Sequence, residues 1–190
     1  IGRLSCNPAI GGVGKSQLVK EIDALGGIMG KAADHSGIQF KTLNKSKGRA
    51  VWSLRVQVDK KLYPQYLQTK IDNEKNITVL SENVVDFNVD NNVIKSAVLA
   101  SGETIITDAI IICSGTFLNG KIHIGDKQYA AGRFGEKPAI TLSQSIINKG
   151  FKTLRLKTGT PPRLLTSSIN WDLCSLHPGD KDPESFSFFN

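Results

Sequence analysis

Residues 5–27 gather the residue types with the clearest potential for chemistry. They combine the thiol of Cys6, a proline turn, glycines at positions 11, 12 and 14, and Lys15 at the start of an amphipathic pattern. Glycines let the backbone approach a ligand closely, and free amides that lead into a helix N-terminus form a natural anion site. The stretch therefore predicts a loop that holds an anionic ligand, and two different classes of protein could carry it.

One class is the P-loop nucleotide triphosphatases. Residues 9–16 match a relaxed phosphate-binding loop in which alanine replaces the first glycine. Such a loop needs an apolar strand directly before it and a later strand that ends in a Mg²⁺-binding aspartate. Residues 1–7 are too short and polar for that strand, and the best later candidate, residues 110–113, has no acid at its tip. The sequence therefore argues against this class.

The composition is that of a globular protein with a basic balance. The 190 residues include 24 basic and 17 acidic side chains, which gives a net charge of +7. This surplus fits a nucleic acid or another anionic partner, although many soluble proteins are mildly basic. The length supports one sizeable core, as one domain with an appendage.

Three widely spaced cysteines, Cys6, Cys113 and Cys174, include no CxxC pair. Their spacing argues against a disulfide framework or a zinc site and suits a reducing compartment. The chain has no apolar run of about 18 residues, so no membrane span is expected. The first residues lack the pattern of a signal peptide and of an initiating methionine, and the chain is interpreted as a piece of a longer protein.

The elements that must position the loop follow from apolar periodicity. A helix is expected after Lys15, with Leu18, Ile22 and Leu25 on one face. Further helices are expected over 31–36, 58–71 (with Pro64 in its interior) and 139–148, and strands over 38–40, 77–80, 84–89, 93–100, 103–107, 109–113 and 185–189. The run 109–113 is apolar on both faces, which is typical of a buried parallel strand.

Two basic stretches stand out between these elements. Residues 41–61 interleave seven cations with Trp52, and residues 154–163 carry three cations and no acid on a loop fixed by glycine and prolines. Cations beside an aromatic ring can hold phosphates and stack a base, and rigid cations suit phosphate capture. The alternative for the first stretch is a solvated face with one core tryptophan.

The order of helix, edge strand, antiparallel meander and buried strand resembles the second part of a two-dinucleotide-binding flavoprotein domain. The predicted fold class is α/β. It is an incomplete FAD/NAD(P)-binding, Rossmann-like domain of the glutathione-reductase type with an antiparallel β-meander. The first strand and its GxGxxG loop would precede residue 1.

Six long motifs follow one another over nearly the whole chain. They are SCNPAIGGVGKSQLVKEIDALGG, GIQFKTLNKSKGRAV, LRVQVDKKLY, GTFLNGKIHIG, AAGRFGEKPA and LKTGTPPR. In this order they resemble the MnmG family, also called GidA, of FAD-dependent tRNA uridine 5-carboxymethylaminomethyl modification enzymes. The resemblance implies that residues 1–120 belong to the FAD-binding domain. Residues 121–190 would form its return segment and the start of an inserted substrate- or NADH-side region.

The resemblance also implies an activity, cofactors and partners. Family enzymes use FAD, with NADH and methylene-tetrahydrofolate as co-substrates, to place a carbon on C5 of the wobble uridine of tRNA. Glycine or ammonium supplies the nitrogen in bacteria, and taurine does so in mitochondria. A GTPase of the MnmE type is the implied partner, and the implied assembly is a homodimer in the cytoplasm or the mitochondrial matrix. This fragment by itself is expected to be inactive and poorly stable.

The resemblance assigns roles to single residues. Cys6 matches a proposed family cysteine and could add as a thiolate to C6 of uracil, which makes C5 nucleophilic, but it could equally be a packing residue beside the flavin. The cofactor-binding candidates are Val84, Ala139, Asn7, Gly11, Gly12, Lys15, Gly115 and Thr116. The candidates for tRNA phosphates or a folate carboxylate are Lys47, Arg55, Arg155, Lys157 and Arg163, each of which could instead be a solvated surface residue.

Some residues depart from the family pattern. Ser16 and Gln17 stand where the family usually has Gly-His, Arg49 where it has proline, and Ala139 where it commonly has a flavin-contacting serine. These departures leave a second hypothesis, a non-catalytic or degenerate tRNA- or protein-binding paralogue of the same fold. A third hypothesis is a relative of the folate-dependent tRNA uridine methyltransferases. Those enzymes also use flavin chemistry, but they lack the first and last of the six motifs.

Overall fold

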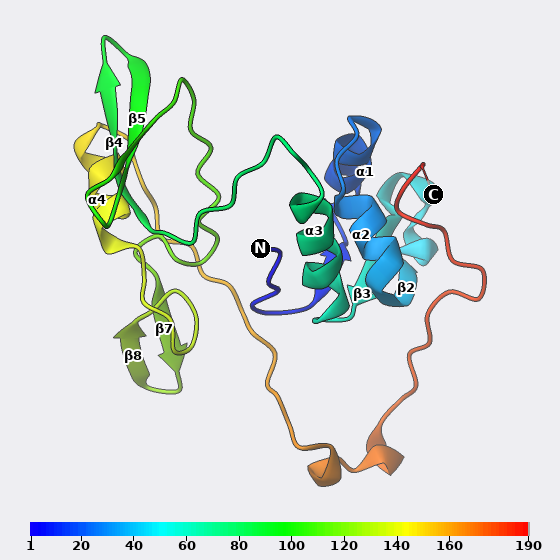
Figure 1. Ribbon diagram of the computed structural model, residues 1–190. Coiled ribbons are helices and arrows are strands. Elements are labelled where there is room, and N and C mark those ends of the chain that lie inside the picture. The colour runs from blue at the N-terminus through cyan, green and yellow to red at the C-terminus, as the bar shows by residue number, and fades with distance from the viewer. Residues whose placement is uncertain (190) are drawn as a thin grey trace. The chain divides into compact units, whose positions relative to one another are not determined.

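The computed structural model describes residues 1–189, which form two compact units (Figure 1). Unit 1 comprises Ile1–Thr78 together with the segment from Thr158 onward, and unit 2 is the continuous stretch Val79–Lys157. None of the helices within residues 1–189 is long and apolar enough to cross a membrane. The same residues contain no cluster of three or more side chains with the spacing of metal ligands.

Unit 1 is a small antiparallel sheet with three helices. The strands are β1 (Ala9–Gly11), β2 (Gly37–Leu43) and β3 (Ser53–Val58), in the order β1-β3-β2. The helices are α1 (Ser16–Ala24), α2 (Met29–Ser36) and α3 (Leu62–Asp72). Helix α2 packs between α1 and α3 and against β3, so the helices cover the central strand. Both strand pairs are antiparallel.

The core of unit 1 joins the two ends of the chain. The central strand buries Val56 and Val58 completely, as its alternating apolar pattern requires. Phe186 is also fully buried and packs in the same cluster, although it lies more than a hundred residues further along. Two short helices, at Thr166–Ser168 and Trp171–Leu173, lie on the path by which the chain returns. The return segment is therefore part of the core.

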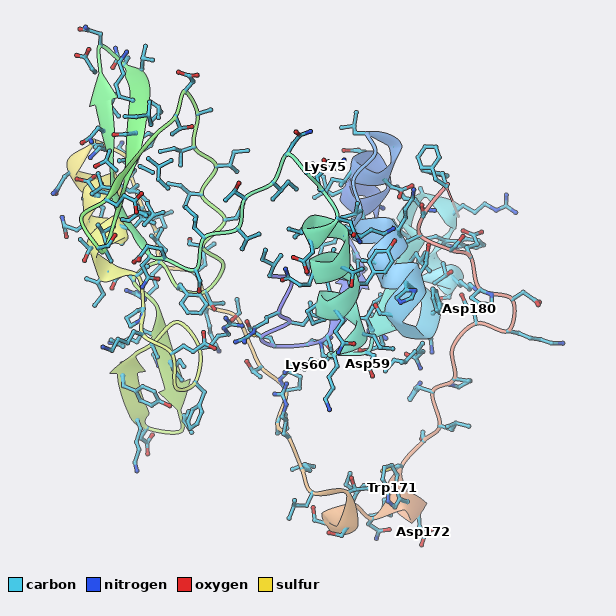
Figure 2. All side chains as sticks on the ribbon, viewed as in Figure 1. Asp59, Lys60, Lys75, Trp171, Asp172 and Asp180 are labelled. Atoms are coloured by element: carbon cyan, nitrogen blue, oxygen red, sulfur yellow. The ribbon has the colours of Figure 1, made fainter. Side chains whose placement is uncertain are left out.

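The return segment is also tied to the edge of the sheet. The amide of Asp180 donates to the carbonyl of Phe40 at 2.8 Å, and its carboxylate accepts from the amide of Thr42 at 2.8 Å. The same carboxylate pairs with Lys45 at 3.0 Å. Asp180 is labelled in Figure 2. These bonds occupy backbone groups of β2 that would otherwise stay free at a sheet edge.

Helix α3 begins later than its apolar pattern suggests. The carboxylate of Asp59 accepts hydrogen bonds from the amides of Leu62 and Lys61 at 2.9 and 2.7 Å, and these bonds lower the pKa of Asp59. Because the helix starts at Leu62, Pro64 lies in its first turn, where a missing N–H costs no helical bond. The expectation of a proline inside a helix over 58–71 was wrong, since residues up to Val58 belong to β3.

Unit 2 is a meander with one covering helix. Its strands are β4 (Val84–Asp90), β5 (Val93–Leu99) and β6 (Thr104–Ile106), joined by tight turns, and β7 (Lys121–Ile124) with β8 (Lys127–Ala130) forms a separate hairpin. Asn91 and Asn92 both have positive φ, as a two-residue hairpin turn of this kind requires. Helix α4 (Ile140–Asn148) buries Leu142 and Ile146 against Phe87. The predicted meander and helix are confirmed.

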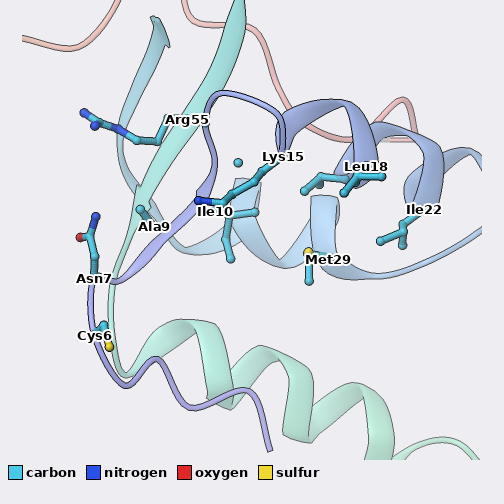
Figure 3. A pocket seen from close by; sticks show the side chains of 12 residues that line it. Cys6, Asn7, Ala9, Ile10, Lys15, Leu18, Ile22, Met29 and Arg55 are labelled. Atoms are coloured by element: carbon cyan, nitrogen blue, oxygen red, sulfur yellow. The ribbon is translucent and has the colours of Figure 1, made fainter. Parts of the chain in front are cut away.

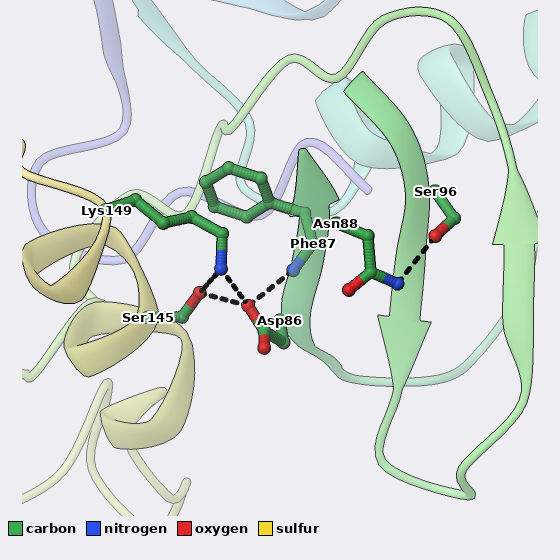
Figure 4. Close-up of polar contacts among 6 residues, drawn as sticks. All are labelled: Asp86, Phe87, Asn88, Ser96, Ser145 and Lys149. Atoms are coloured by element: carbon green, nitrogen blue, oxygen red, sulfur yellow. Dashed lines mark hydrogen bonds and ion pairs between the residues drawn. The ribbon is translucent and has the colours of Figure 1, made fainter. Parts of the chain in front are cut away.

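A polar cluster fastens α4 to β4 (Figure 4). The carboxylate of Asp86 accepts from the ammonium of Lys149 at 2.7 Å, from the hydroxyl of Ser145, and from the amide of Phe87 at 2.7 Å. These bonds, led by the one from Lys149, lower the pKa of Asp86 from its ordinary value of 3.8 to about 2. The ammonium also lies 4.7 Å from the centre of the Phe87 ring.

Three predicted strands are absent from residues 1–189. Residues 109–113 pair with no strand, and Ile111 is 88% exposed. An apolar strand of this kind needs parallel neighbours on both sides, whereas every sheet in the described residues is antiparallel. Residues 77–80 are extended without a partner. Residues 185–189 bond to side chains of two helices instead of joining a sheet.

Candidate functional site

A pocket of ≈ 610 Å³ lies beside the glycine-rich loop of unit 1 (Figure 3). It collects all five cofactor or catalytic candidates from the opening stretch and one of the basic candidates from β3. They are Cys6, Asn7, Gly11, Gly12, Lys15 and Arg55. The pocket therefore unites residues that the sequence placed in two separate motifs.

The pairing of β1 with β3 explains how Arg55 reaches this pocket. Gly11 lies opposite Arg55 in the antiparallel register, so the guanidinium is held next to the loop. Its Nε atom is buried and has no hydrogen-bond partner. An unpaired buried donor is costly, and a ligand that accepts this hydrogen bond would remove the cost. Lys15 reaches towards the same side of the pocket from the start of α1 (Figure 3).

Gly11 has a backbone shape that no other residue fits. Its φ is +82°, and a Cβ atom there would lie 2.4 Å from the carbonyl oxygen of Leu54 and 2.5 Å from the ring of Phe186. The loop then closes on itself, because the amides of Lys15 and Ser16 both donate to the carbonyl of Gly12 at 3.0 Å. These amides are therefore engaged within the loop, unlike those of a phosphate-binding loop, which point at the ligand.

The opposite wall of the pocket is apolar. Leu18 and Ile22 of α1 line it together with Met29 at the start of α2 (Figure 3). The expected apolar face of α1 exists, but it does not enter the core. Leu18 is 56% exposed, while the buried residues of the helix are Ser16, Val19 and Asp23. The pocket thus offers a flat apolar side and a cationic side.

The thiol of Cys6 contacts the last family-like motif. The hydroxyl of Thr160 donates to Cys6 Sγ at 3.4 Å, and Arg163 Nη2 donates to the carbonyl oxygen of Cys6 at 3.2 Å. The other two cysteines, Cys113 and Cys174, are exposed and lie outside the pocket. Cys6 is therefore the cysteine that combines partial burial, polar contacts and an adjoining cavity.

The remaining cofactor candidates lie in unit 2. Val84 and Ala139 pack against the cluster of Phe87 and α4. The amide of Ala139 donates to Phe117 at 2.8 Å, and its carbonyl accepts from Asn119 at 3.1 Å, so both main-chain groups of Ala139 already have partners. Gly115 has a positive φ in the turn before this segment. Thr116 uses its hydroxyl to bond the carbonyl of Gly132 at 2.8 Å.

The other basic candidates are spread over both units. Lys47 is exposed in a short helix, Lys45–Lys47, that leads to a second one at Arg49–Val51. Nearby, the guanidinium of Arg49 lies 5.7 Å from the ring of Trp52, whose indole donates to a carbonyl at 3.3 Å. In unit 2, Lys157 is exposed, and Arg155 donates to the carbonyl of Asn119 at 3.0 Å. The second basic stretch, residues 154–163, thus crosses the boundary between the units.

Sequence reasoning missed the residues that support the loop from below. Phe186 packs against Gly11. Asp34 holds the segment that carries Phe186, because its two carboxylate oxygens accept hydrogen bonds from the backbone amides of Phe186 at 2.7 Å and Ser187 at 2.8 Å. Asp23 accepts from the amide of Phe188 at 2.8 Å. The aromatic run near the end of the chain was the only available signal, and it predicted a strand.

Comparison with known proteins decides the family. The family model for glucose inhibited division protein A matches residues 1–190. The chain belongs to the GidA family.

Relatives and solved structures of this family agree closely with the chain. It is 48% identical over 189 residues to the tRNA uridine 5-carboxymethylaminomethyl modification enzyme MnmG of Chlorobium phaeobacteroides. The matched region covers 99% of the chain and 30% of that relative. The MnmG of a Sulfurihydrogenibium species is 46% identical over 191 residues, covering 100% of the chain and 31% of the relative. Two crystal forms of Aquifex aeolicus GidA each match at a TM-score of 0.92 and 47% identity, over 100% of the chain and 32% of the crystallised one.

The GidA match confirms the predicted family and fold class. The fold is the α/β, Rossmann-like arrangement of the family with its antiparallel meander. The chain spans about a third of the length of the relatives and structures that it matches.

Proposed function

We propose that the protein to which this chain belongs modifies C5 of the wobble uridine of tRNA in an FAD-dependent reaction. The observation that carries the proposal is a single pocket lined by both Cys6 and Arg55. The chain is also 48% identical to a tRNA uridine 5-carboxymethylaminomethyl modification enzyme. The alternative of a non-catalytic paralogue predicts the same fold without flavin, and the experiment below separates the two.

The residues of the pocket fit a flavin ring. Leu18, Ile22 and Met29 offer an apolar surface to a flat heteroaromatic system, and the buried Nε of Arg55 needs an acceptor such as a ring oxygen or nitrogen. Gly11 and Gly12 leave no side chain between the backbone and a ligand. When bound, the flavin would supply the redox chemistry that links NADH oxidation to the one-carbon unit of methylene-tetrahydrofolate.

Cys6 is the proposed nucleophile towards uracil. Its thiolate would form a C–S bond at C6, and the electron pair of the C5–C6 double bond would move towards C5 and the O4 carbonyl. C5 then attacks the methylene carbon of methylene-tetrahydrofolate, and the carbon–nitrogen bond that breaks leaves its electron pair on the folate nitrogen, which takes up a proton. Loss of the C5 proton and expulsion of the Cys6 thiolate restore the double bond, so the thiol is regenerated.

Basic side chains would hold the anionic parts of the substrates. The proposed set for tRNA phosphates or a folate carboxylate is Lys47, Arg55, Arg155, Lys157 and Arg163. Among these, Lys47 and Lys157 are exposed, and arginines retain donors beyond the single bond that Arg155 and Arg163 each make here. In unit 2, Val84, Ala139, Gly115 and Thr116 are proposed to contact FAD, and for Val84 the proposed contact is through its backbone.

The proposal extends to the partner, the oligomeric state and the location of the whole protein. It includes an MnmE-type GTPase as partner, a homodimer, and a cytoplasmic or mitochondrial location, with glycine, ammonium or taurine as the amine donor. Residues 1–120 would belong to the FAD-binding domain, and residues 121–190 to its return segment and the start of an inserted region.

The test is made on the full-length protein. We expect it to purify with flavin absorbance and to restore the modified wobble uridine when supplied with FAD, NADH, methylene-tetrahydrofolate and the GTPase. Cys6→Ala should abolish the modification and keep the flavin, whereas the control Cys174→Ala should retain both. A folded, colourless protein that cannot be reconstituted with FAD would overturn the proposal in favour of the non-catalytic paralogue.

A further inference from the structure

The motif of residues 157–163 makes two contacts with a single distant residue. Thr160 Oγ1 donates to Cys6 Sγ at 3.4 Å, and Arg163 Nη2 donates to the Cys6 carbonyl oxygen at 3.2 Å. The partners lie 154 and 157 positions apart in the sequence. One contact therefore acts on the side chain of Cys6 and the other on its main chain.

The sequence between the two donors makes their spacing rigid. Pro161 and Pro162 separate Thr160 from Arg163, and each proline ring fixes its φ. The far side of Cys6 is also constrained, because Asn7 precedes Pro8 and accepts a bond from the amide of Ala9 at 2.8 Å. Two donors separated by prolines thus meet Cys6, whose following neighbour Asn7 has a restricted backbone.

We propose that Thr160 and Arg163 are positioning residues for the thiol of Cys6. Arg163 fixes the peptide that carries the thiol, and the hydroxyl of Thr160 selects the direction of the sulfur and donates to it when it is a thiolate. Hydrogen bonds to an ionised acceptor are the stronger ones, so this contact favours the reactive form. The proposal rests on the nucleophilic role given to Cys6 above.

The first experiment measures how fast iodoacetamide alkylates Cys6 in the full-length protein, by mass spectrometry of its peptide. Thr160→Val keeps the shape and removes the hydroxyl, and we expect Cys6 alkylation to slow about three- to tenfold, the range of one hydrogen bond. Thr160→Ser restores the hydroxyl and should restore the rate. Thr158→Val is the control in the same loop, and Cys113 and Cys174 are internal references.

Arg163 is tested in the same assay, without tRNA, so that any contact of the guanidinium with substrate plays no part. Arg163→Met, which removes the donors and keeps an unbranched side chain, should slow alkylation of Cys6, and Arg163→Lys, which keeps a cationic donor group, should recover part of the rate. Arg133→Met, which loses an ion pair with Glu136 in unit 2, should leave the rate unchanged.

Two results would overturn this assignment. One is a wild-type alkylation rate in both Thr160→Val and Arg163→Met. The other is a Thr160→Ser protein as slow as Thr160→Val, which would show that the hydroxyl is not the relevant group. The assay measures the thiol directly and does not depend on tRNA modification. If the wild-type protein fails to modify tRNA but the Thr160 and Arg163 variants still alkylate slowly, the positioning role is supported and the proposed function is rejected.

Discussion

Unit 1 and unit 2 differ in how far apart along the chain their interacting residues lie. In unit 1 the carboxylate of Asp34 binds the amides of Phe186 and Ser187, 152 and 153 positions away. In unit 2 most pairing joins neighbouring strands, and the Asp86–Lys149 bond spans only 63 positions. Closing a longer loop costs more chain entropy, so unit 1 depends on strong individual contacts to hold its distant segment.

This difference bears on the candidate site. The pocket with Cys6 lies in unit 1, where Gly11 rests directly on Phe186 and Cys6 contacts Thr160. Both supporting residues come from the returning segment. The loop that carries the predicted chemistry therefore needs residues from both ends of the chain, whereas the meander of unit 2 is completed by one continuous stretch.

The largest expected effect comes from removing the buried aromatic ring of unit 1. Phe186→Ala leaves a cavity among Ile10, Leu54 and Val56 and should destabilise unit 1 by about 3–5 kcal/mol. Hydrogen exchange followed by mass spectrometry should show lost protection in β3 and retained protection in β5. The control Phe189→Ala, at an exposed position, should change little. Equal loss of protection in both units would show that they unfold together and that the stability of unit 2 is not independent of Phe186.

A smaller effect is expected from weakening the clamp on the same segment. Asp34→Asn replaces a carboxylate that accepts two amide bonds by a group with one carbonyl oxygen, and should cost about 2 kcal/mol. Urea unfolding followed by exchange of the β3 amides would measure it. Asp72→Asn is the matched control, because that exposed carboxylate accepts from Gln68 within its own helix. A cost no larger than that of the control would show that Asp34 does not hold the returning segment in place.

The smallest effect concerns the polar cluster of unit 2 and depends on pH. The pKa of Asp86 is lowered from 3.8 to about 2, so its stabilisation is complete above pH 4 and is lost as the pH falls towards 2. Because Asp86 is partly exposed, we expect only about 1 kcal/mol. Asp86→Asn should therefore be less stable than wild type at pH 7 and should match it near pH 2, as read from exchange of the β4 amides. A constant difference across this range would contradict the assignment.

Local elements were predictable from the sequence, and long-range placements were not. The turn at Asn91 and Asn92 and the apolar face of α4 follow from residue types within a few positions. Residues 109–113 were wrongly predicted to form a buried parallel strand. An apolar run shows that a segment could be buried between strands, but it does not show whether those neighbouring strands are present. Pro64 was misplaced because β3 ends at Val58 and the Asp59 carboxylate binds the amides of Lys61 and Leu62, where the helix starts. Apolar periodicity reports neither.

The sequence by itself determined the family, the fold class and the glycine-rich loop with its thiol, because motifs and turn residues act through local geometry. It also predicted that Cys6, Gly11 and Lys15 belong to one ligand-binding stretch. The tertiary structure decided that Arg55 joins them across the β1–β3 pair, that the apolar face of α1 lines a pocket, and that Thr160 and Phe186 reach the loop. The contacts of Thr160 and Phe186 with the loop join residues more than a hundred positions apart, and no local sequence pattern encodes such contacts.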